Sequence, residues 1–249
     1  MYGNKISLFI ISDNSGEFIP MNKFAAIGIA LAAIYLIFPI PAFAQSSAFG
    51  SSKGNPMEIY NTGRNLESSG NMQEAEVYYQ QAVKLCNDEI SQNNAGRDTY
   101  TALTWTLLRQ KKYSDVITWG ERGLRQFADE YRILETMGEA FFHLDDYDSS
   151  LRNMQRYINS LPRGERVSIA YFYTGEIYRL QEKNFLADMA YSTAVRLQPG
   201  IALWWYRLGQ VREQTGELQP AAEAYEQALK LSPGYQAAAD GLARVRRAR

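Results

Sequence analysis

Apolar and small residues near the C-terminal end of the chain are spaced as in a pair of helices. Between Leu203 and Glu213, apolar positions follow the 3.6-residue period of an α-helix. The polar stretch Thr215–Glu217 has the composition of a turn. A second helical pattern then runs with small and apolar residues on one face until Pro233 ends it. The pattern therefore predicts two antiparallel helices joined by a short turn.

The same pattern occurs once more, 34 residues earlier. Five pairs of identical residues are separated by this interval: Gly175 and Gly209, Ala187 and Ala221, Tyr191 and Tyr225, Ala194 and Ala228, and Pro199 and Pro233. A fixed period of this size indicates an array of repeats, which stacks units into a curved surface and does not enclose one pocket in one core. Glycine and alanine at the recurring positions are expected where the two helices cross closely.

The recurring residues resemble the tetratricopeptide repeat (TPR) family, whose unit is two antiparallel helices in about 34 residues. The last unit matches the family pattern at Trp205, Leu208, Gly209, Ala221, Tyr225, Ala228 and Pro233. We identify five units, at residues 56–89, 97–130, 131–164, 168–201 and 202–235. The resemblance implies an all-α fold, a right-handed α-solenoid of five TPR helix pairs, with residues 236–249 as a C-terminal capping helix.

The five units are not equally regular. Residues 90–96 separate the first two units, and residues 165–167 separate the third and fourth. The first unit has Asn87 where the terminal proline is usual, so its second helix is expected to continue into the insertion. The second unit fits least well, because Gly120 and Gly123 lie in its second helix. In the capping helix, Ala239, Leu242 and Val245 are expected to form the apolar stripe, beside a cluster of outward-facing arginines.

The N-terminal part has the features of an export signal. A lysine is followed by fifteen apolar residues, Phe24–Phe38, then by two prolines and an Ala-x-Ala pattern that ends at Ala44. This arrangement predicts a signal peptide at residues 21–44, cleaved after Ala44, with the bacterial periplasm as the first expected location. An uncleaved membrane anchor is the alternative. Residues 1–20 are interpreted as an upstream extension before the true start, and residues 45–55 as a flexible linker.

Composition narrows the classes of function. The chain of 249 residues has 26 basic and 27 acidic side chains, so it has no overall basic field for nucleic acid. The single cysteine and single histidine nearly exclude a Cys/His metal site. We interpret Asp145–Asp148 as a helix cap and not a metal site, His143 as non-catalytic and Cys86 as a partly buried side chain. No enzyme activity, cofactor or metal is expected.

In the TPR family, defined positions of each first helix point into the concave groove. Carried onto this chain, the resemblance implies one groove aromatic in each unit: Tyr60, Trp105, Phe142, Phe172 and Tyr206. Charged and polar residues at or beside the groove positions complete the expected partner-binding groove: Arg64, Arg109, Glu135, Glu139, Glu176, Arg179 and Gln210. We interpret these positions as unnecessary for packing, with the alternative that some rings pack against neighbouring first helices. The family's Lys and Asn clamp for a C-terminal carboxylate is absent, since Tyr60 and Arg64 occupy those positions.

Aromatic side chains and arginine are the residue types enriched at protein-binding hot spots. We therefore expect an exported scaffold or adaptor that binds a protein or peptide and helps to organise a cell-envelope complex. A glycan-binding module is an alternative, because aromatic grooves also stack on sugars, and a scaffold tethered to the inner membrane is another. The partner itself is not identified by the sequence.

Overall fold

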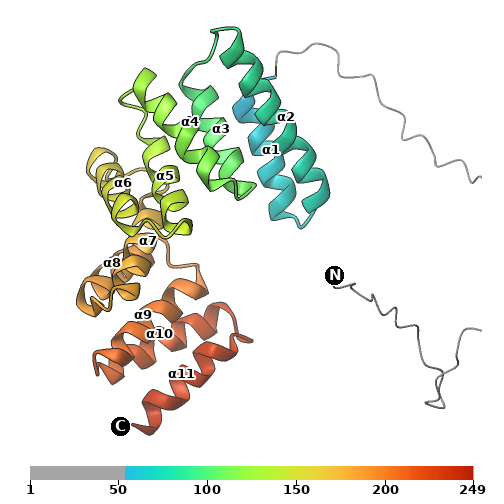
Figure 1. Ribbon diagram of the computed structural model, residues 1–249. Helices are drawn as coiled ribbons and strands as arrows, with labels where there is room; N and C mark the ends of the chain where they lie inside the picture. The colour runs from blue at the N-terminus through green and yellow to red at the C-terminus, as the bar shows by residue number, and fades with distance from the viewer. Residues whose placement is uncertain (1–53, 249) are drawn as a thin grey trace, which may run out of the picture. The chain divides into compact units, whose positions relative to one another are not determined.

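The structure is a computed structural model that describes residues 54–248, and within them every regular element is an α-helix. In chain order the helices are α1 (Pro56–Ser68), α2 (Met72–Ser91), α3 (Arg97–Arg109), α4 (Tyr113–Gln126), α5 (Arg132–His143), α6 (Tyr147–Ser160), α7 (Val167–Leu180), α8 (Asn184–Leu197), α9 (Ala202–Gln214), α10 (Leu218–Leu231) and α11 (Gln236–Arg247). Figure 1 shows them following one another in sequence order from α1 at one end to α11 at the other. The predicted all-α solenoid of helix pairs is confirmed.

The stack curves with its odd-numbered helices on the inner side. Each of α1, α3, α5, α7 and α9 packs closely against the even-numbered helix that follows it. Direct packing also joins α1 to α3, α3 to α5, and α5 to α7, whereas successive even-numbered helices make no comparable contact in residues 54–248. Helices that are closer together lie on the inside of a curve. The odd-numbered helices therefore line the concave face, and the even-numbered helices form the convex face.

Small residues allow the close crossings that the sequence predicts. A Cβ atom added at Gly209 would lie 2.7 Å from the ring of Tyr225, and one at Gly175 would lie equally close to Tyr191. Ala221 is fully buried at the same type of crossing. The tyrosine ring thus occupies the space that each glycine leaves free, so the two helices of a unit are held in contact by shape.

The second unit departs from the repeat pattern for a packing reason. A Cβ atom at Gly120 would lie 2.6 Å from Sδ of Met137, and one at Gly123 would lie 2.9 Å from Cδ1 of Ile133. Both neighbours belong to α5 of the next unit. The glycines that weaken the resemblance therefore let α4 approach α5.

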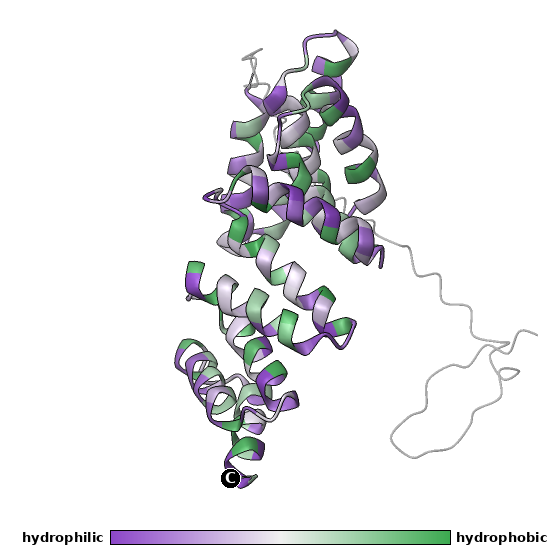
Figure 2. Cartoon of the chain, turned by 90° about the vertical axis from the view of Figure 1, so that its left-hand side faces the viewer, coloured by the Kyte–Doolittle hydropathy of each residue, from purple (hydrophilic) through white to green (hydrophobic). Residues whose placement is uncertain are grey.

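Apolar burial is divided among small clusters along the stack, as a solenoid requires. Figure 2 shows apolar residues distributed along the whole length of the helical part. At the C-terminal end, α11 covers the last cluster with Ala238, Leu242 and Val245, while Ala239 is only partly buried. The expected stripe is therefore correct at two positions, and Ala238 replaces Ala239 in the third.

The insertion after the first unit lengthens its second helix. Helix α2 has 20 residues and α4 has 14, which confirms that the second helix of the first unit continues past the missing proline.

The expected signal peptide at residues 21–44 lies outside the described residues, as do residues 1–20 and residues 45–53 of the expected linker. Among the described residues, none of the helices combines the length and the apolar character that a membrane crossing requires.

Candidate functional site

All the residues expected in the groove lie on odd-numbered helices, but their exposure differs widely. Tyr60, Glu135 and Glu176 are buried, so the interpretation that groove positions are unnecessary for packing is wrong for these three. Arg64 and Arg109 are exposed. The remaining expected groove residues are partly buried, with one side packed and another open: Trp105, Glu139, Phe142, Phe172, Arg179, Tyr206 and Gln210.

Ion pairs join each odd-numbered helix to the next along the concave face. In every pair the carboxylate belongs to the earlier helix, and the arginine belongs to the following helix or its N-cap. The pairs are Glu67 with Arg109, Asp98 with Arg132, Glu135 and Glu139 with Arg166, Glu176 with Arg207, and Glu213 with Arg244. We call this set the inter-unit ion pairs. They neutralise much of the charge that the sequence places in the groove.

Three of these carboxylates also bond to the second helix of their own unit. The hydroxyl of Tyr225 donates to Glu213 over 2.6 Å, and the hydroxyl of Tyr79 donates to Glu67 over 2.5 Å. Tyr191 donates to Glu176 in the same way. Each of these carboxylates therefore connects a tyrosine inside its unit to an arginine of the next unit, and so helps to set the angle between units.

The electrostatics of these pairs follow from burial and hydrogen bonding. The hydrogen bonds of Arg244 and Tyr225 hold the pKa of Glu213 below its ordinary value. At Glu67, burial opposes the same effect, but the bonds from Arg109 and Tyr79 keep the pKa low. These two carboxylates are therefore ionised at neutral pH, as ion pairing requires.

The ion pairs between α5 and α7 include the most buried carboxylate of the concave face. Glu135 has no exposed side-chain surface, and Arg166, the N-cap residue of α7, donates to both of its oxygens. Burial raises the pKa of Glu135 to about 7, although Arg166 opposes the rise. The hydroxyl of Tyr173 donates to the neighbouring Glu139 over 2.8 Å, and burial raises the pKa of that tyrosine.

The groove aromatics form clusters with rings from the adjacent helices. The ring of Trp105 lies 5.5 Å from Tyr60, and the ring of Phe172 stacks on Trp204 at 5.1 Å. Phe142 packs at 5.0 Å from Tyr173, and Tyr206 at 5.0 Å from Tyr235. Trp105, Phe142, Phe172 and Tyr206 are only partly buried, so each cluster combines a packing role with an open surface. Packing of groove rings against neighbouring helices is the alternative expected from the sequence.

The N-terminal half of the concave face has an unsatisfied hydrogen-bond donor and several cations. The indole Nε1 of Trp105 is buried and has no acceptor among the described residues. Burial raises the pKa of nearby Tyr60, while the charges of Arg166, Arg109 and Arg64 oppose the rise. Most buried polar atoms in proteins have a hydrogen-bond partner, so the unpartnered indole N–H of Trp105 is an unusual feature of this face.

The residues considered for metal binding or catalysis occupy a helix cap, a buried position and an aromatic stack. Asp146 is the N-cap of α6 and accepts from the backbone N–H of Ser149 over 3.0 Å, which confirms the capping interpretation. Cys86 is completely buried, more than expected, and burial raises the pKa of its thiol to about 12. His143 is exposed, and its ring stacks on Tyr113 at 4.6 Å. Within residues 54–248 no group of three or more metal-ligating side chains converges.

Comparison with known families agrees with this architecture. Models of the tetratricopeptide repeat match residues 59–89 and residues 202–235, which are the first and last helix pairs. The chain is a tetratricopeptide repeat protein. The TPR assignment accounts for the glycine–tyrosine crossings, because these are the positions at which the family pattern repeats.

Solved structures of other TPR proteins share the fold. The crystal structure of TTC0263 from Thermus thermophilus has a TM-score of 0.55 and 16% identity, and the match covers 76% of this chain and 98% of that one. MamA from Desulfovibrio magneticus RS-1 has a TM-score of 0.55 and 16% identity, with 74% and 99% covered. Identities this low show similarity of fold alone.

A curated relative is much longer than this chain. The human protein O-mannosyl-transferase TMTC1 is 26% identical over 190 residues, which cover 76% of this chain and 20% of the relative. The chain thus spans about a fifth of that protein's length. The similarity is not a basis for transferring the relative's activity.

Proposed function

We propose that this TPR protein is an exported scaffold that holds a segment of a partner protein along its concave face and helps to organise a cell-envelope complex. It is not proposed to be an enzyme. The observation that carries the proposal is the series of partly exposed aromatic rings on successive odd-numbered helices, Trp105, Phe142, Phe172 and Tyr206. Such rings gain binding energy when a ligand covers their open side.

The inter-unit ion pairs favour an apolar peptide segment over a charged chain terminus as the ligand. Because they already join most groove carboxylates to arginines, few charges are left to grip a charged chain terminus. An extended peptide with apolar side chains supplies apolar contact to the open sides of the rings and does not need those charges.

The location is proposed from the N-terminal sequence. The apolar stretch Phe24–Phe38 and the Ala-x-Ala pattern ending at Ala44 favour export and cleavage. The first residue of the mature protein is the test: Gln45 supports release into the periplasm, whereas an intact N-terminus supports a tethered scaffold.

The experiment on the groove replaces its aromatic rings with a smaller apolar side chain, so that no large cavity is created. In the variant Trp105→Leu/Phe142→Leu/Phe172→Leu, leucine keeps apolar volume beside Tyr60, Tyr173 and Trp204 but removes the flat aromatic surface. Trp119→Leu is the matched control, because Trp119 is a tryptophan on the convex helix α4 that is not fully buried. Partner proteins captured from cells by each variant are quantified, and circular dichroism checks that helical content is unchanged.

We expect the triple variant to lose capture of the specific partner and Trp119→Leu to retain it. Capture that survives the triple substitution would show that the groove rings are not the binding surface. The same purified proteins are tested against cell-wall glycans, because binding there, without a protein partner, would favour the carbohydrate alternative.

A further inference from the structure

A cleft opens on the convex side of the protein between α4 and α6. The successive even-numbered helices of residues 54–248 do not pack closely on each other, so the space between these two is open down to α5. The cleft measures about 410 Å³, and its apolar lining includes the partly buried side chains of Leu124 on α4 and Phe141 on α5. We call it the α4–α6 cleft. Because two convex helices form its walls, it is separate from the concave groove.

Three arginines and one glutamate line the α4–α6 cleft. Arg125 belongs to α4, whereas Arg152 and Arg156 lie one helical turn apart on the same face of α6. Glu121 lies 3.8 Å from Arg125, and both side chains are more than half exposed, so this ion pair is weak. In the described part of the chain, neither arginine of α6 forms an ion pair. Positive charge is therefore concentrated here, in a chain whose net charge is -1.

The repeat provides a reference for this cleft, because the same positions of the fourth and fifth units also line a cleft. Arg196 has the place of Arg125 there. Arg212 has the place of Phe141, and Asp188 neutralises it over 2.7 Å. The two α10 positions equivalent to the arginines of α6 are Glu223 and Gln227. The TPR architecture therefore does not require an apolar floor surrounded by three arginines.

We propose that the α4–α6 cleft binds an acidic peptide segment of a partner protein. An apolar side chain of the segment packs against Leu124 and Phe141, and carboxylates on either side of it pair with the three arginines. A guanidinium can bind a carboxylate through two parallel hydrogen bonds, so arginines on both walls favour a chain with carboxylates that lies between them. The apolar floor favours a peptide over an anionic polymer without apolar side chains. Occupation of this cleft leaves the concave groove open for its own ligand.

The experiment selects peptides from a random-peptide phage library on the purified full-length protein. Enriched peptides are synthesised with a dye, and their dissociation constants are measured by fluorescence anisotropy. In Arg152→Glu/Arg156→Gln, α6 carries the residue types that α10 has at the equivalent positions. Arg196→Glu/Arg247→Gln is the matched control, because it makes the same change of net charge at two exposed arginines outside the cleft. Circular dichroism checks that both variants are folded.

We expect the selection to enrich peptides in which Asp or Glu residues flank an apolar residue. Their dissociation constants should rise more than about tenfold in Arg152→Glu/Arg156→Gln and stay unchanged in the matched control. They should also stay unchanged in the triple leucine variant of the groove, which separates this proposal from the function proposed for the concave face. A selection that enriches no acidic peptides, or acidic peptides whose affinity is insensitive to the α6 substitutions, overturns the proposal.

The apolar part of the proposal has its own test. Replacing the apolar residue of an enriched peptide with serine should raise the dissociation constant about three- to tenfold, because contact with the apolar floor is lost. An unchanged dissociation constant would show that the cleft attracts any polyanion, and would overturn the assignment of a peptide segment with an apolar side chain.

Discussion

The guanidinium of Arg166 donates to both carboxylate oxygens of Glu135, which lies 31 residues earlier on the concave face. Glu135 has no exposed side-chain surface, and the same guanidinium also reaches Glu139 over 3.0 Å. Arg166 belongs to residues 165–167, which lie outside the repeat pattern. An insertion between two units thus supplies the cation that neutralises a buried carboxylate.

Removing this cation should destabilise the fold in a pH-dependent way. Arg166→Met leaves Glu135 buried without its partner, which typically reduces the free energy of unfolding by about 3 kcal/mol when the carboxyl is ionised. The loss should be largest at pH 8 and smaller at pH 5, because a protonated Glu135 needs no counter-charge. Urea denaturation at the two pH values measures the difference.

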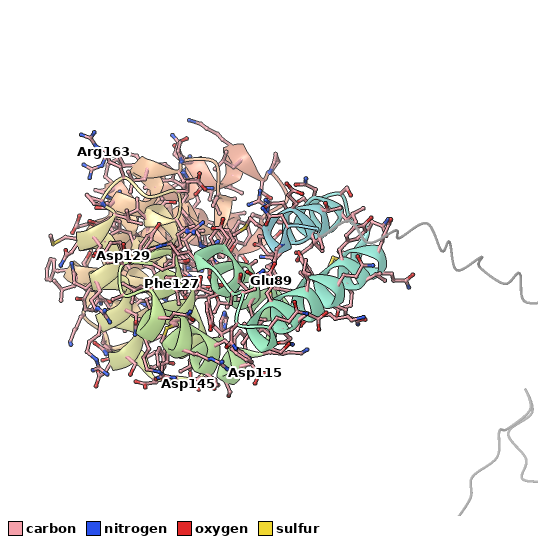
Figure 3. The ribbon with its side chains drawn as sticks, turned by 90° about the horizontal axis from the view of Figure 1, so that it is seen from above. Glu89, Asp115, Phe127, Asp129, Asp145 and Arg163 are labelled. Carbon is pink, nitrogen blue, oxygen red and sulfur yellow. The ribbon has the colours of Figure 1, made fainter. Side chains whose placement is uncertain are left out.

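Arg163→Met is the control for that substitution. Arg163 is exposed in the same inter-helix segment, and Figure 3 shows its side chain pointing away from the body of the protein. Its free energy of unfolding should match that of the wild type at both pH values. An equal loss from both substitutions, or a loss at Arg166 that is independent of pH, contradicts the role given to the Glu135–Arg166 pair.

Glu135 should also make the wild-type stability depend on pH. Burial raises the pKa of the folded carboxyl from 4.5 to about 7, so the folded state holds a proton that the unfolded state has already lost. The contribution of this group to stability therefore falls as pH rises from about 4.5 to about 7. Glu135→Gln removes the titration and leaves Arg166 paired with Glu139, so its stability should fall less steeply over that range. Identical slopes for the two proteins argue against a raised pKa.

The crossing of α9 and α10 should not tolerate a methyl group. In Gly209→Ala the new Cβ meets the Tyr225 ring at 2.7 Å. We expect a loss of about 1–3 kcal/mol from overpacking, although alanine is otherwise the better helix former. Gly200→Ala is the comparison, because nothing lies within 4 Å of a Cβ there. Thermal unfolding of both variants separates the crowding from the general effect of replacing glycine.

The helix pairs could be predicted because the residues that position them recur. Gly209 and Tyr225 have counterparts 34 residues earlier, and their contact is made within one unit, so local spacing contains the information. The inter-unit ion pairs could not be predicted in the same way. Arg166 lies in an insertion, and the position of Glu135 in the repeat predicts a groove residue. Whether a groove residue faces a ligand or the next unit depends on the angle between units.

The exposed apolar residues of α8 illustrate a second limit of the pattern. Helix α8 is apolar around much of its circumference, since Ala187 and Tyr191 are packed inward while Phe185 and Met189 face outward. Periodicity indicates that such residues belong to a helix but does not separate its packed side from its open side. Arg244, one of the arginines expected to face outward, is half exposed and also pairs with Glu213, a contact that the pattern does not predict.

Site-specific cross-linking inside cells tests the central claim most directly. A photoreactive amino acid is placed at Arg64 or Gln210, at the same concave position of the first and last units, and at Gln73 or Gln219, at equivalent positions of the convex helices α2 and α10. We predict that a partner protein is cross-linked from the two concave positions and not from the two convex ones. Cross-links to a partner from the convex positions alone, or equally from both faces, would contradict the concave face as the binding surface.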